Sequence, residues 1–367
     1  MSSKLFSPLE LRNLTLNNRI AVSSMCQYCS ENGSAVDWHL MHLGQFCMGA
    51  AGLVMTEATA VSPIGRISHK CLGLYSDENE VALKRVIDFC RKYGVTAMGI
   101  QIGHAGRKGS THVPSEGGNP LAEDENPWAT VAPSAIPFAP GWHLPQKLSR
   151  EGLAAIKAEF DDATERAARI GFDLVELHCA HGYLLHQFLS PLSNQRSDEF
   201  GVKLENRMRY PLEVFEAVRA AWPADKPLGV RISATDWIEG GWNIEESVVF
   251  AKALKSLGCD FIDVSSGALD PRQKIPLEPG YQVPFSFQIR KQAEIKTWTV
   301  GMITKARQAE EIISSGKADV VALARGMMFD PRWAWHAAEE LGVDTEYSSM
   351  YARCAPSQWP EVFPWHN

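Results

Sequence analysis

The chain lacks the long apolar run that a membrane-spanning helix needs, and it lacks an excess of positive charge. Across its 367 residues, no uninterrupted apolar stretch is long enough to cross a bilayer. The first ten residues, MSSKLFSPLE, also lack the apolar centre of a secretion signal. The net charge of −7 argues against nucleic acid or an anionic membrane as the main partner. These absences favour a cytoplasmic protein that binds a small molecule.

Closely spaced cysteines are scarce as well. The eight cysteines are scattered singly apart from Cys26-Gln-Tyr-Cys29, which suits a reducing compartment better than a disulfide scaffold. A zinc ribbon would need a second pair of this kind, and a thioredoxin-like site would need its first cysteine to open a helix in a much smaller fold. The motif therefore favours neither type of site.

Short apolar runs alternate with helix-period segments, which predicts an α/β fold with a parallel sheet. The eight runs are Arg19–Val22, Gly52–Thr56, Ala97–Ile102, Phe172–Leu177, Leu228–Ile232, Phe261–Val264, Thr297–Val300 and Asp319–Leu323. The expected helices are Glu80–Tyr93, Arg150–Ile170, Asn206–Trp222, Ile244–Leu257, Lys305–Ser314 and Pro331–Leu341. Eight such units close most naturally into a single (β/α)₈ TIM barrel. An open doubly wound sheet is the alternative, weakened by the lack of a GxGxxG motif after the first run.

The barrel accounts for most of the chain. We expect one domain over residues 1–345 and a C-terminal tail over residues 346–367. The segment 104–148, which follows the third strand, is rich in proline, glycine and tryptophan and does not show a helical pattern. It is therefore predicted to be a long excursion, a lid or subdomain, over the mouth of the barrel.

The fourth run is followed directly by the hexapeptide His178-Cys-Ala-His181-Gly-Tyr183. This hexapeptide places two imidazoles and a phenol at the end of a buried strand. In a TIM barrel, catalytic groups lie at the C-terminal ends of the strands. Such a group of side chains can hold a carbonyl oxygen and deliver a proton beside it. A half-formed metal site and a hydrogen-bonded core pair are the alternatives that the hexapeptide alone leaves open.

Two glycine-bearing turns follow the seventh and eighth runs. Gly301 follows the seventh, and Ala324-Arg325-Gly326 follows the eighth. Barrels commonly bind phosphate at this place, through backbone N–H groups and a cationic side chain. The alternative is that these are ordinary turns with a surface arginine.

The chain as a whole resembles the Old Yellow Enzyme family of FMN-dependent ene-reductases, in its shorter, thermophilic-like branch that includes the bacterial NADPH dehydrogenases. The matching segments are RIAVSSMCQY (19–28), GIQIGHAGRKG (99–109), ELHCAHGYLLHQFLSPLSNQRSDEFG (176–201), NRMRYPLEV (206–214), DFIDVSSGAL (260–269), VGMIT (300–304) and VALARGMMFDP (321–331). So many matches in order, over nearly the whole length, make the resemblance specific.

The resemblance implies FMN as cofactor, NADPH or NADH as a transient hydride donor, and an activated alkene such as an enone as substrate. The residues that it places on FMN are Ser23, Ser24, Met25, Cys26, Ala58, Gln101, Arg231, Gly301, Ala324 and Arg325. It also implies that His178 and His181 bind the substrate carbonyl, Tyr183 donates the proton, Tyr28 lines the substrate side, and the Cys26 thiol tunes the flavin potential. No metal is implied.

Physical arguments agree with these roles. A fixed cation such as Arg231 near the flavin N1 stabilises the charge that develops there on reduction. Two imidazole N–H donors on a developing oxyanion could each contribute roughly 2.7 to 4 kcal/mol. Tyrosine is protonated at neutral pH and can still protonate a basic enolate carbon. Because a Rossmann motif is absent, we expect the nicotinamide to leave before the substrate enters, which gives ping-pong kinetics.

Some features depart from the family pattern or leave alternatives open. Ser24 stands where many relatives have proline, and Cys29 adds a second thiol near the site. In relatives the tail often reaches the active site of a neighbouring subunit, which implies a homo-oligomer. Arg353 is the preferred candidate for the residue that enters that site, and Trp359 is the other. A tail that is simply solvated fits the sequence as well. Two other readings are a non-catalytic flavin-binding barrel and a zinc-dependent barrel hydrolase, for which Glu57 would be a poor additional ligand.

Overall fold

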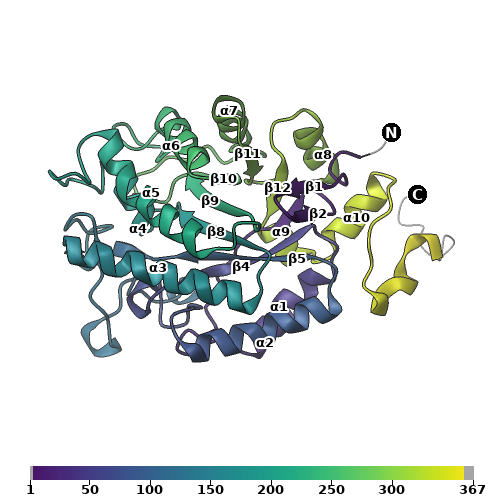
Figure 1. The fold of residues 1–367 in the computed structure, drawn as a ribbon, viewed down its shortest axis with the longest axis horizontal. Helices are drawn as coiled ribbons and strands as arrows, with labels where there is room; N and C mark the ends of the chain where they lie inside the picture. Colours follow the sequence, from purple (N-terminus) through teal and green to yellow (C-terminus); the bar gives the residue numbers. More distant parts are fainter. Residues whose placement is uncertain (1–2, 359–367) are drawn as a thin grey trace.

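The computed structural model describes residues 3–358, and its centre is a closed barrel of parallel strands (Figure 1). In chain order the strands are β3 (Ile20–Val22), β4 (Leu53–Ala60), β5 (Ala97–Gly103), β8 (Leu174–Cys179), β9 (Leu228–Ser233), β10 (Phe261–Ser265), β11 (Lys296–Thr299) and β12 (Val320–Leu323). Each pairs with the next, and β12 pairs with β3 to close the ring. The predicted (β/α)₈ barrel and its eight strands are confirmed, and the doubly wound alternative is wrong.

Helices surround the barrel on its outside (Figure 1). The longer ones are α1 (Asp37–Cys47), α2 (Asp77–Tyr93), α3 (Arg150–Ile170), α5 (Leu204–Ala221), α6 (Ile244–Ser256), α7 (Val283–Ala293), α8 (Ala306–Ser314) and α10 (Trp333–Glu340). Two short helices, α4 (Leu184–Leu189) and α9 (Arg325–Phe329), follow β8 and β12 at their C-terminal ends. The six helices predicted from periodicity are confirmed to within a few residues, whereas α1, α4, α7 and α9 were not predicted.

The chain enters β8 through a well-defined helix end. Helix α3 begins where the Ser149 side chain accepts a hydrogen bond from the backbone N–H of Gly152, and it ends at Gly171. Gly171 has a φ of 96°, a left-handed conformation that glycine adopts without strain. Its N–H donates to the carbonyl oxygens of Ala167 and Ala168, which satisfies the last turn of the helix. The reversal directs the chain into the strand that carries His178.

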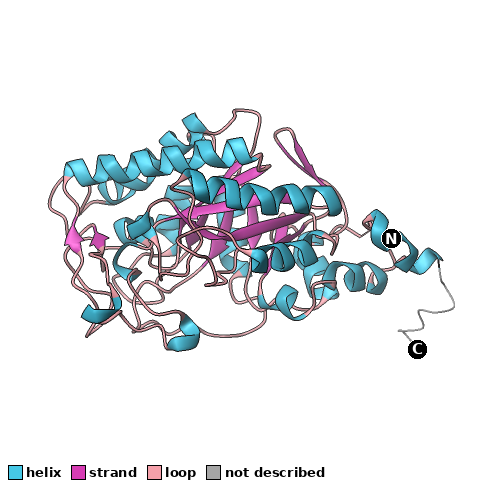
Figure 2. Ribbon diagram, turned by 90° about the horizontal axis from the view of Figure 1, so that it is seen from below, coloured by secondary structure: helices cyan, strands magenta, loops and turns pink. Residues whose placement is uncertain are grey.

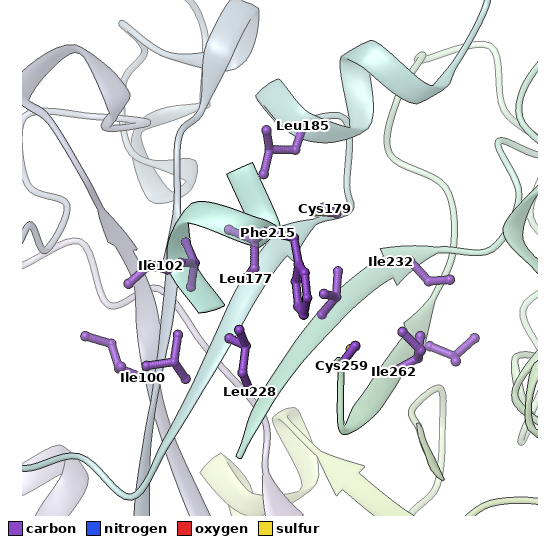
Figure 3. Close-up of a cluster of buried hydrophobic side chains, with 14 of the residues drawn as sticks. Ile100, Ile102, Leu177, Cys179, Leu185, Phe215, Leu228, Ile232, Cys259 and Ile262 are labelled. Carbon is purple, nitrogen blue, oxygen red and sulfur yellow. The ribbon is translucent and has the colours of Figure 1, made fainter. Parts of the chain in front are cut away.

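The strands pack against the helices through their outward-facing side chains. In β8, Val175, Leu177 and Cys179 belong to the large buried cluster that the helices share, whereas Leu174 belongs to a second cluster inside the barrel. Figure 3 shows Leu177 and neighbouring apolar side chains of β5 and β9 in the same layer as Phe215 of α5. Because side chains alternate along a strand, Glu176 and His178 face the barrel interior with Leu174.

The N-terminal end of the barrel is closed by apolar side chains. A hairpin of β1 (Leu9–Leu11) and β2 (Leu14–Leu16) places its leucines in one buried cluster with the strand starts. Within this cluster, the rings of Phe261 and Trp298 stack with centroids 4.0 Å apart. The polar interior residues therefore lie toward the opposite, C-terminal mouth.

The segment 104–148 contains no α-helix, as expected. It forms three short 3₁₀ turns and a pair of two-residue strands, β6 (Val131–Ala132) and β7 (Gln146–Lys147). Arg107 Nη2 donates to the carbonyl oxygen of Leu269, which lies beyond β10. The segment thus contacts the loops at the C-terminal mouth. Its role as a lid stays a prediction, as does the division of the chain into a domain and a tail.

The tail begins at the other end of the barrel. Asn17 Nδ2 donates to Glu346 Oε2 at 2.6 Å, and Ser348 Oγ donates to the carbonyl oxygen of Tyr93 at 2.7 Å. Figure 2 shows the β6–β7 pair and the last described helices at opposite ends of the molecule. Arg353 is exposed in a 3₁₀ segment (Ser349–Cys354), and Trp359 lies outside the described residues. The tail therefore starts far from the C-terminal ends of the barrel strands in the same chain.

Candidate active site

Three rings meet at the end of β8. The ring centroid of His178 lies 5.2 Å from that of His181 and 5.1 Å from that of Tyr183, and both pairs are close to perpendicular. Burial is the main cause that lowers the pKa of both histidines well below the usual value, and the Arg231 charge adds to it. Burial likewise raises the pKa of the Tyr183 phenol. At neutral pH the cluster is two neutral imidazoles and a protonated phenol.

The turn between the rings has an unusual backbone. His181 has a φ of 58° and Gly182 a φ of 72°, so two successive residues are left-handed. A Cβ atom on residue 182 would lie 2.4 Å from the carbonyl oxygen of Ala268, which explains why glycine is there. The N–H of Gly182 donates to His186 Nδ1 at 2.9 Å, and His186 Nε2 lies 3.0 Å from Asp236 Oδ1 in a fully buried pair. This pair holds the turn.

Both histidines have a defined neighbour on one ring nitrogen. His178 Nδ1 accepts from the N–H of Ala180 at 3.3 Å, which leaves the ring proton on Nε2. His181 Nε2 lies 2.7 Å from Ser265 Oγ on β10, and its backbone N–H donates to Ser233 Oγ at 2.9 Å. Ser265 Oγ is also within 3.3 Å of Gln282 Oε1. The tautomer of His181 therefore depends on the direction in which the Ser265 hydroxyl points.

A half-buried lysine lies close to these rings. Lys108 Nζ donates to the carbonyl oxygens of His181 and Ala268, each at 2.8 Å, and lies 5.2 Å from the Tyr183 ring centroid. Burial, with the nearby Arg107 charge, lowers the pKa of Lys108 to about 7. The lysine joins the segment after β5 to the turns after β8 and β10.

The segment after β3 places Cys26 and Tyr28 on another side of the mouth. Glu57 Oε2 accepts from the N–H of Gln27 at 3.1 Å, and Glu57 Oε1 lies 3.2 Å from Nε2 of the buried His39. Burial and the Glu57 carboxylate raise the pKa of the Cys26 thiol well above its usual value.

The two thiols of the CxxC motif are therefore protonated at neutral pH. The same two causes raise the pKa of Cys29 to about 11. A thioredoxin-like site would need a lowered pKa, so this alternative gains no support. In this segment Ser23 is buried, and Ser24, Met25 and Tyr28 are half-buried, with Tyr28 at a φ of 53°.

Four polar side chains occupy the interior below the mouth. Gln101 Nε2 donates to Glu176 Oε1 at 2.7 Å, and Arg231 Nε lies 3.1 Å from Asp263 Oδ2. Arg231 is opposite both His178 and Asp263 in the strand register, and Gln101 is opposite Ala58. Within residues 3–358, Arg231 Nε finds no hydrogen-bond acceptor with good geometry, although Asp263 Oδ2 lies near it. A buried guanidinium with unused donors fits a planar acceptor such as the pyrimidine edge of a flavin.

The turns after β11 and β12 lie side by side because these strands pair. Gly301 has a φ of 110°, and a Cβ there would lie 2.8 Å from Gln282 Nε2. Ala324 precedes α9, and Arg325, its first residue, is exposed. A glycine turn next to a turn that carries an exposed guanidinium fits a phosphate. The predicted cofactor residues thus lie at the C-terminal ends of the barrel strands, and their contacts with a flavin stay a prediction.

A hollow adjoins the rings of His178 and Tyr183. It holds about 270 Å³, part of it open to solvent, and its lining includes Ala58, His178 and Tyr183. Arg66, Ile67, Cys71 and His104 complete one wall. Burial lowers the pKa of His104 to about 3, so this imidazole is neutral. Arg66, Ile67 and Cys71 were not expected from the sequence, because they lie in a loop after β4 that carries no motif.

The described residues offer little to the zinc alternative and contain no membrane span. Between residues 3 and 358 there is no group of three or more His, Cys, Asp and Glu side chains placed to hold a metal. In the same range, no helix is both long enough and apolar enough to cross a bilayer.

Comparisons with known proteins agree with the geometry. Residues 4–344 match the NADH:flavin oxidoreductase / NADH oxidase family. The NADPH dehydrogenase of Geobacillus sp. (strain WCH70) is 43% identical over 355 residues, which cover 96% of this chain and 99% of that protein. The structure of morphinone reductase in complex with tetrahydroNAD has 25% identity and a TM-score of 0.76, covering 94% of this chain and 93% of its own. The old yellow enzyme homologue of Zymomonas mobilis, at 23% identity, has the same fold, with a TM-score of 0.77 over 98% of this chain and 99% of its own.

The family match spans the whole barrel, and the Geobacillus relative is similar over nearly its full length. The resemblance seen in the sequence motifs is thereby confirmed. The chain belongs to the NADH:flavin oxidoreductase / NADH oxidase family and is an FMN-dependent oxidoreductase.

Proposed function

We propose that the protein reduces the activated C=C bond of α,β-unsaturated carbonyl compounds, with NADPH or NADH as the source of hydride. The observation that carries the proposal is the meeting of the His178, His181 and Tyr183 rings, of which His178 and Tyr183 line a hollow together with Ala58. Bound FMN supplies the hydride transfer, which no side chain can perform. The side chains bind and orient the substrate and move its proton.

His178 and His181 hold the substrate carbonyl oxygen. His178 Nε2 carries a proton because Nδ1 accepts from the Ala180 N–H. His181 donates from Nδ1 when the Ser265 hydroxyl donates to its Nε2. Neutral imidazoles suit this role, because their N–H groups stabilise the charge that develops on the oxygen as hydride is added to the β-carbon.

Tyr183 protonates the carbon next to the carbonyl. Its ring lies beside that of His178, and both rings line the same hollow. The raised pKa keeps the proton on the phenol until the substrate becomes strongly basic. Tyr28, whose hydroxyl contacts the Cys26 thiol, lines the substrate side.

The remaining predicted residues would hold the flavin. Arg231 and Gln101 would bind the pyrimidine part of the ring, and Ser23, Ser24, Met25 and Ala58 would line it. Cys26 contributes a neutral thiol that tunes the potential without attacking the substrate. Gly301, Ala324 and Arg325 bind the phosphate.

The hydride donor is a nicotinamide that binds and leaves before the substrate binds. The similar Geobacillus protein is named an NADPH dehydrogenase, and morphinone reductase has been solved in complex with tetrahydroNAD. We propose ping-pong kinetics, with the donor and the enone occupying the same face. A homo-oligomer, in which Arg353 reaches a neighbouring subunit, is consistent with a tail that starts at the N-terminal end of the barrel.

Half-reaction kinetics test the proposal. The purified protein should be yellow and release FMN on heating, and the flavin absorbance should bleach on anaerobic mixing with NADPH. Mixing the bleached protein with 2-cyclohexenone should restore the colour and yield cyclohexanone. Bleaching without reoxidation by any enone would contradict the proposed reaction and favour another electron acceptor. A bound flavin that neither NADPH nor NADH bleaches would favour the non-catalytic barrel.

A further inference from the structure

Two carboxyl groups lie side by side in the barrel interior with one guanidinium. Glu176 on β8 and Asp263 on β10 are both buried, and Arg231 on β9 lies between their strands. Arg231 Nε is 3.1 Å from Asp263 Oδ2, which balances one negative charge. A second buried carboxylate would have no cation to balance it, and an unbalanced buried charge is very costly.

The hydrogen bonds show where a proton would be held. Glu176 Oε1 accepts from Gln101 Nε2 at 2.7 Å. The other oxygen, Glu176 Oε2, and Asp263 Oδ1 are buried and receive no hydrogen bond from any donor within residues 3–358. The two carboxyl groups are close enough for a hydrogen bond to each other. One proton between them would satisfy both oxygens at once.

We infer that Glu176 and Asp263 hold one proton between them, and that this proton prevents a net negative charge beside the flavin. With the proton, the three groups together are neutral. Without it they carry a negative charge below the proposed position of the flavin pyrimidine edge. The inference rests on the proposed function in its placement of the flavin beside Arg231. Glu176 and Asp263 are thus positioning residues that act through the guanidinium.

The surroundings support the proton on Glu176. Burial and then the Asp263 charge raise the pKa of Glu176 to about 8, while Arg231 and Gln101 act in the opposite direction. Asp263 is the partner of Arg231 and keeps the negative charge, although burial raises its pKa as well. His178, two residues further along β8, is neutral because of burial.

The flavin potential should therefore respond to this proton. As the pH rises through about 8, Glu176 ionises and adds a negative charge below the ring. Negative charge disfavours electron transfer to the flavin, so the midpoint potential of the wild type should fall with pH more steeply in this range than the flavin's own protonation requires. Glu176→Gln should not show this additional fall, because its amide N–H can replace the shared proton toward Asp263 Oδ1 while its oxygen still accepts from Gln101.

Infrared spectroscopy and redox titration on the holoenzyme test the inference. At pH 7 the wild type should show the C=O stretch of a buried protonated carboxyl, and this band should disappear in Glu176→Gln. It should also disappear in Asp263→Asn, where Glu176 becomes the sole carboxylate partner of Arg231 and ionises. Glu159→Gln is the control for the potential, because Glu159 is another carboxyl whose pKa burial raises and it lies on α3, outside the barrel. The flavin midpoint potential of Glu159→Gln should change with pH in the same way as that of the wild type.

The outcomes test the shared proton and its effect on the flavin potential separately. A wild type without the infrared band overturns the shared proton, even if the variants do not fold. A band that Glu176→Gln removes, together with the same pH dependence of the potential in both proteins, overturns the coupling to the flavin. Failure of the proposed function would look different, because enone reoxidation would be lost while the band and the potential, which need no substrate, would still be as described.

Discussion

The Nε2 atom of His181 lies 2.7 Å from the Oγ atom of Ser265. A hydroxyl that donates to Nε2 fixes the imidazole proton on Nδ1, whereas a hydroxyl that accepts leaves Nδ1 without a proton. Ser265 on β10 therefore selects what His181 on the β8 turn can offer to a ligand. It lies within the matching segment DFIDVSSGAL (260–269), which assigns it no role, and its contact with His181 depends on the closed barrel that brings β10 near the β8 turn.

Ser265→Ala should weaken the binding of phenolic ligands, because His181 loses the partner that fixes its donor. The loss of one hydrogen bond contributes about 0.5 to 1.5 kcal/mol, which corresponds to roughly two- to tenfold in Kd. Titration of the oxidised holoenzyme with p-hydroxybenzaldehyde, followed by flavin absorbance, measures it. Ser286→Ala is the matched control, because Ser286 is a buried serine on α7 whose Oγ donates to Thr297 Oγ1 at 2.9 Å. Equal affinities for Ser265→Ala and wild type would show that the hydroxyl does not set the tautomer.

Tyr183→Phe should slow the reoxidation of the flavin by an enone about 10²- to 10⁴-fold, the usual effect of losing a general acid. Phenylalanine keeps the ring beside His178, so bleaching by NADPH and phenol binding should be close to wild type. Stopped-flow reoxidation by 2-cyclohexenone is the measurement. A wild-type rate would remove the phenol from proton delivery, and slower bleaching by NADPH would assign it a different task.

Arg325→Ala should weaken FMN binding, because the phosphate loses its charge-assisted hydrogen bonds. Such bonds contribute about 1.5 to 3 kcal/mol, or roughly 10- to 150-fold in Kd. Titration of the apoprotein with FMN, followed by fluorescence quenching, gives the affinity. Arg307→Ala is the control, since Arg307 is an exposed arginine on α8 that pairs with Glu340. An unchanged affinity in Arg325→Ala would place the phosphate elsewhere.

Lys108 should make the protein more stable as the pH rises above 7. Burial lowers its folded-state pKa to about 7, below the usual 10.5, so the unfolded chain binds more protons between these values. The free energy of unfolding contributed by this group therefore increases from pH 7 toward pH 10. Lys108→Met should remove that increase, and the difference between variant and wild type in urea denaturation at pH 7 and pH 9.5 measures it. The same difference at both pH values would mean that Lys108 stays charged in the folded protein.

The barrel could be predicted from the sequence because its signal is local. Strands buried on both faces are continuous apolar runs, and each of the eight was found within a few residues. Helices α1 and α7 were missed because their apolar and polar residues do not separate cleanly. In α1, Trp38 and Met41 are 47% exposed while His39 and His42 are buried, and in α7 Phe287 is exposed while Ser286 is buried. Periodicity alone does not detect such helices.

The site was predicted in part for a similar reason. His178, His181 and Tyr183 lie within one hexapeptide, and the strand-end rule places the other expected residues at the same mouth. Two buried pairs that support the site were missed. Asp236 meets His186, and Asp263 meets Glu176, only after the barrel has closed. His186 could have been noticed as a third imidazole close to the hexapeptide. Glu176 and Asp263 lie within matching segments, but nothing in the sequence indicated that they meet, since each appears as a single acid within an apolar run.

Lys108 also bears on how this barrel can be re-engineered. Its ammonium group is a shared anchor for the carbonyl oxygens of His181 and Ala268, which belong to two different loops. Loop exchange between relatives usually treats the segments at a barrel mouth as independent modules. Here the segment after β5 is mechanically tied to the turns after β8 and β10, so a graft that moves Lys108 would shift the histidine turn even if every catalytic side chain were retained. A chimera should therefore transfer the three segments together.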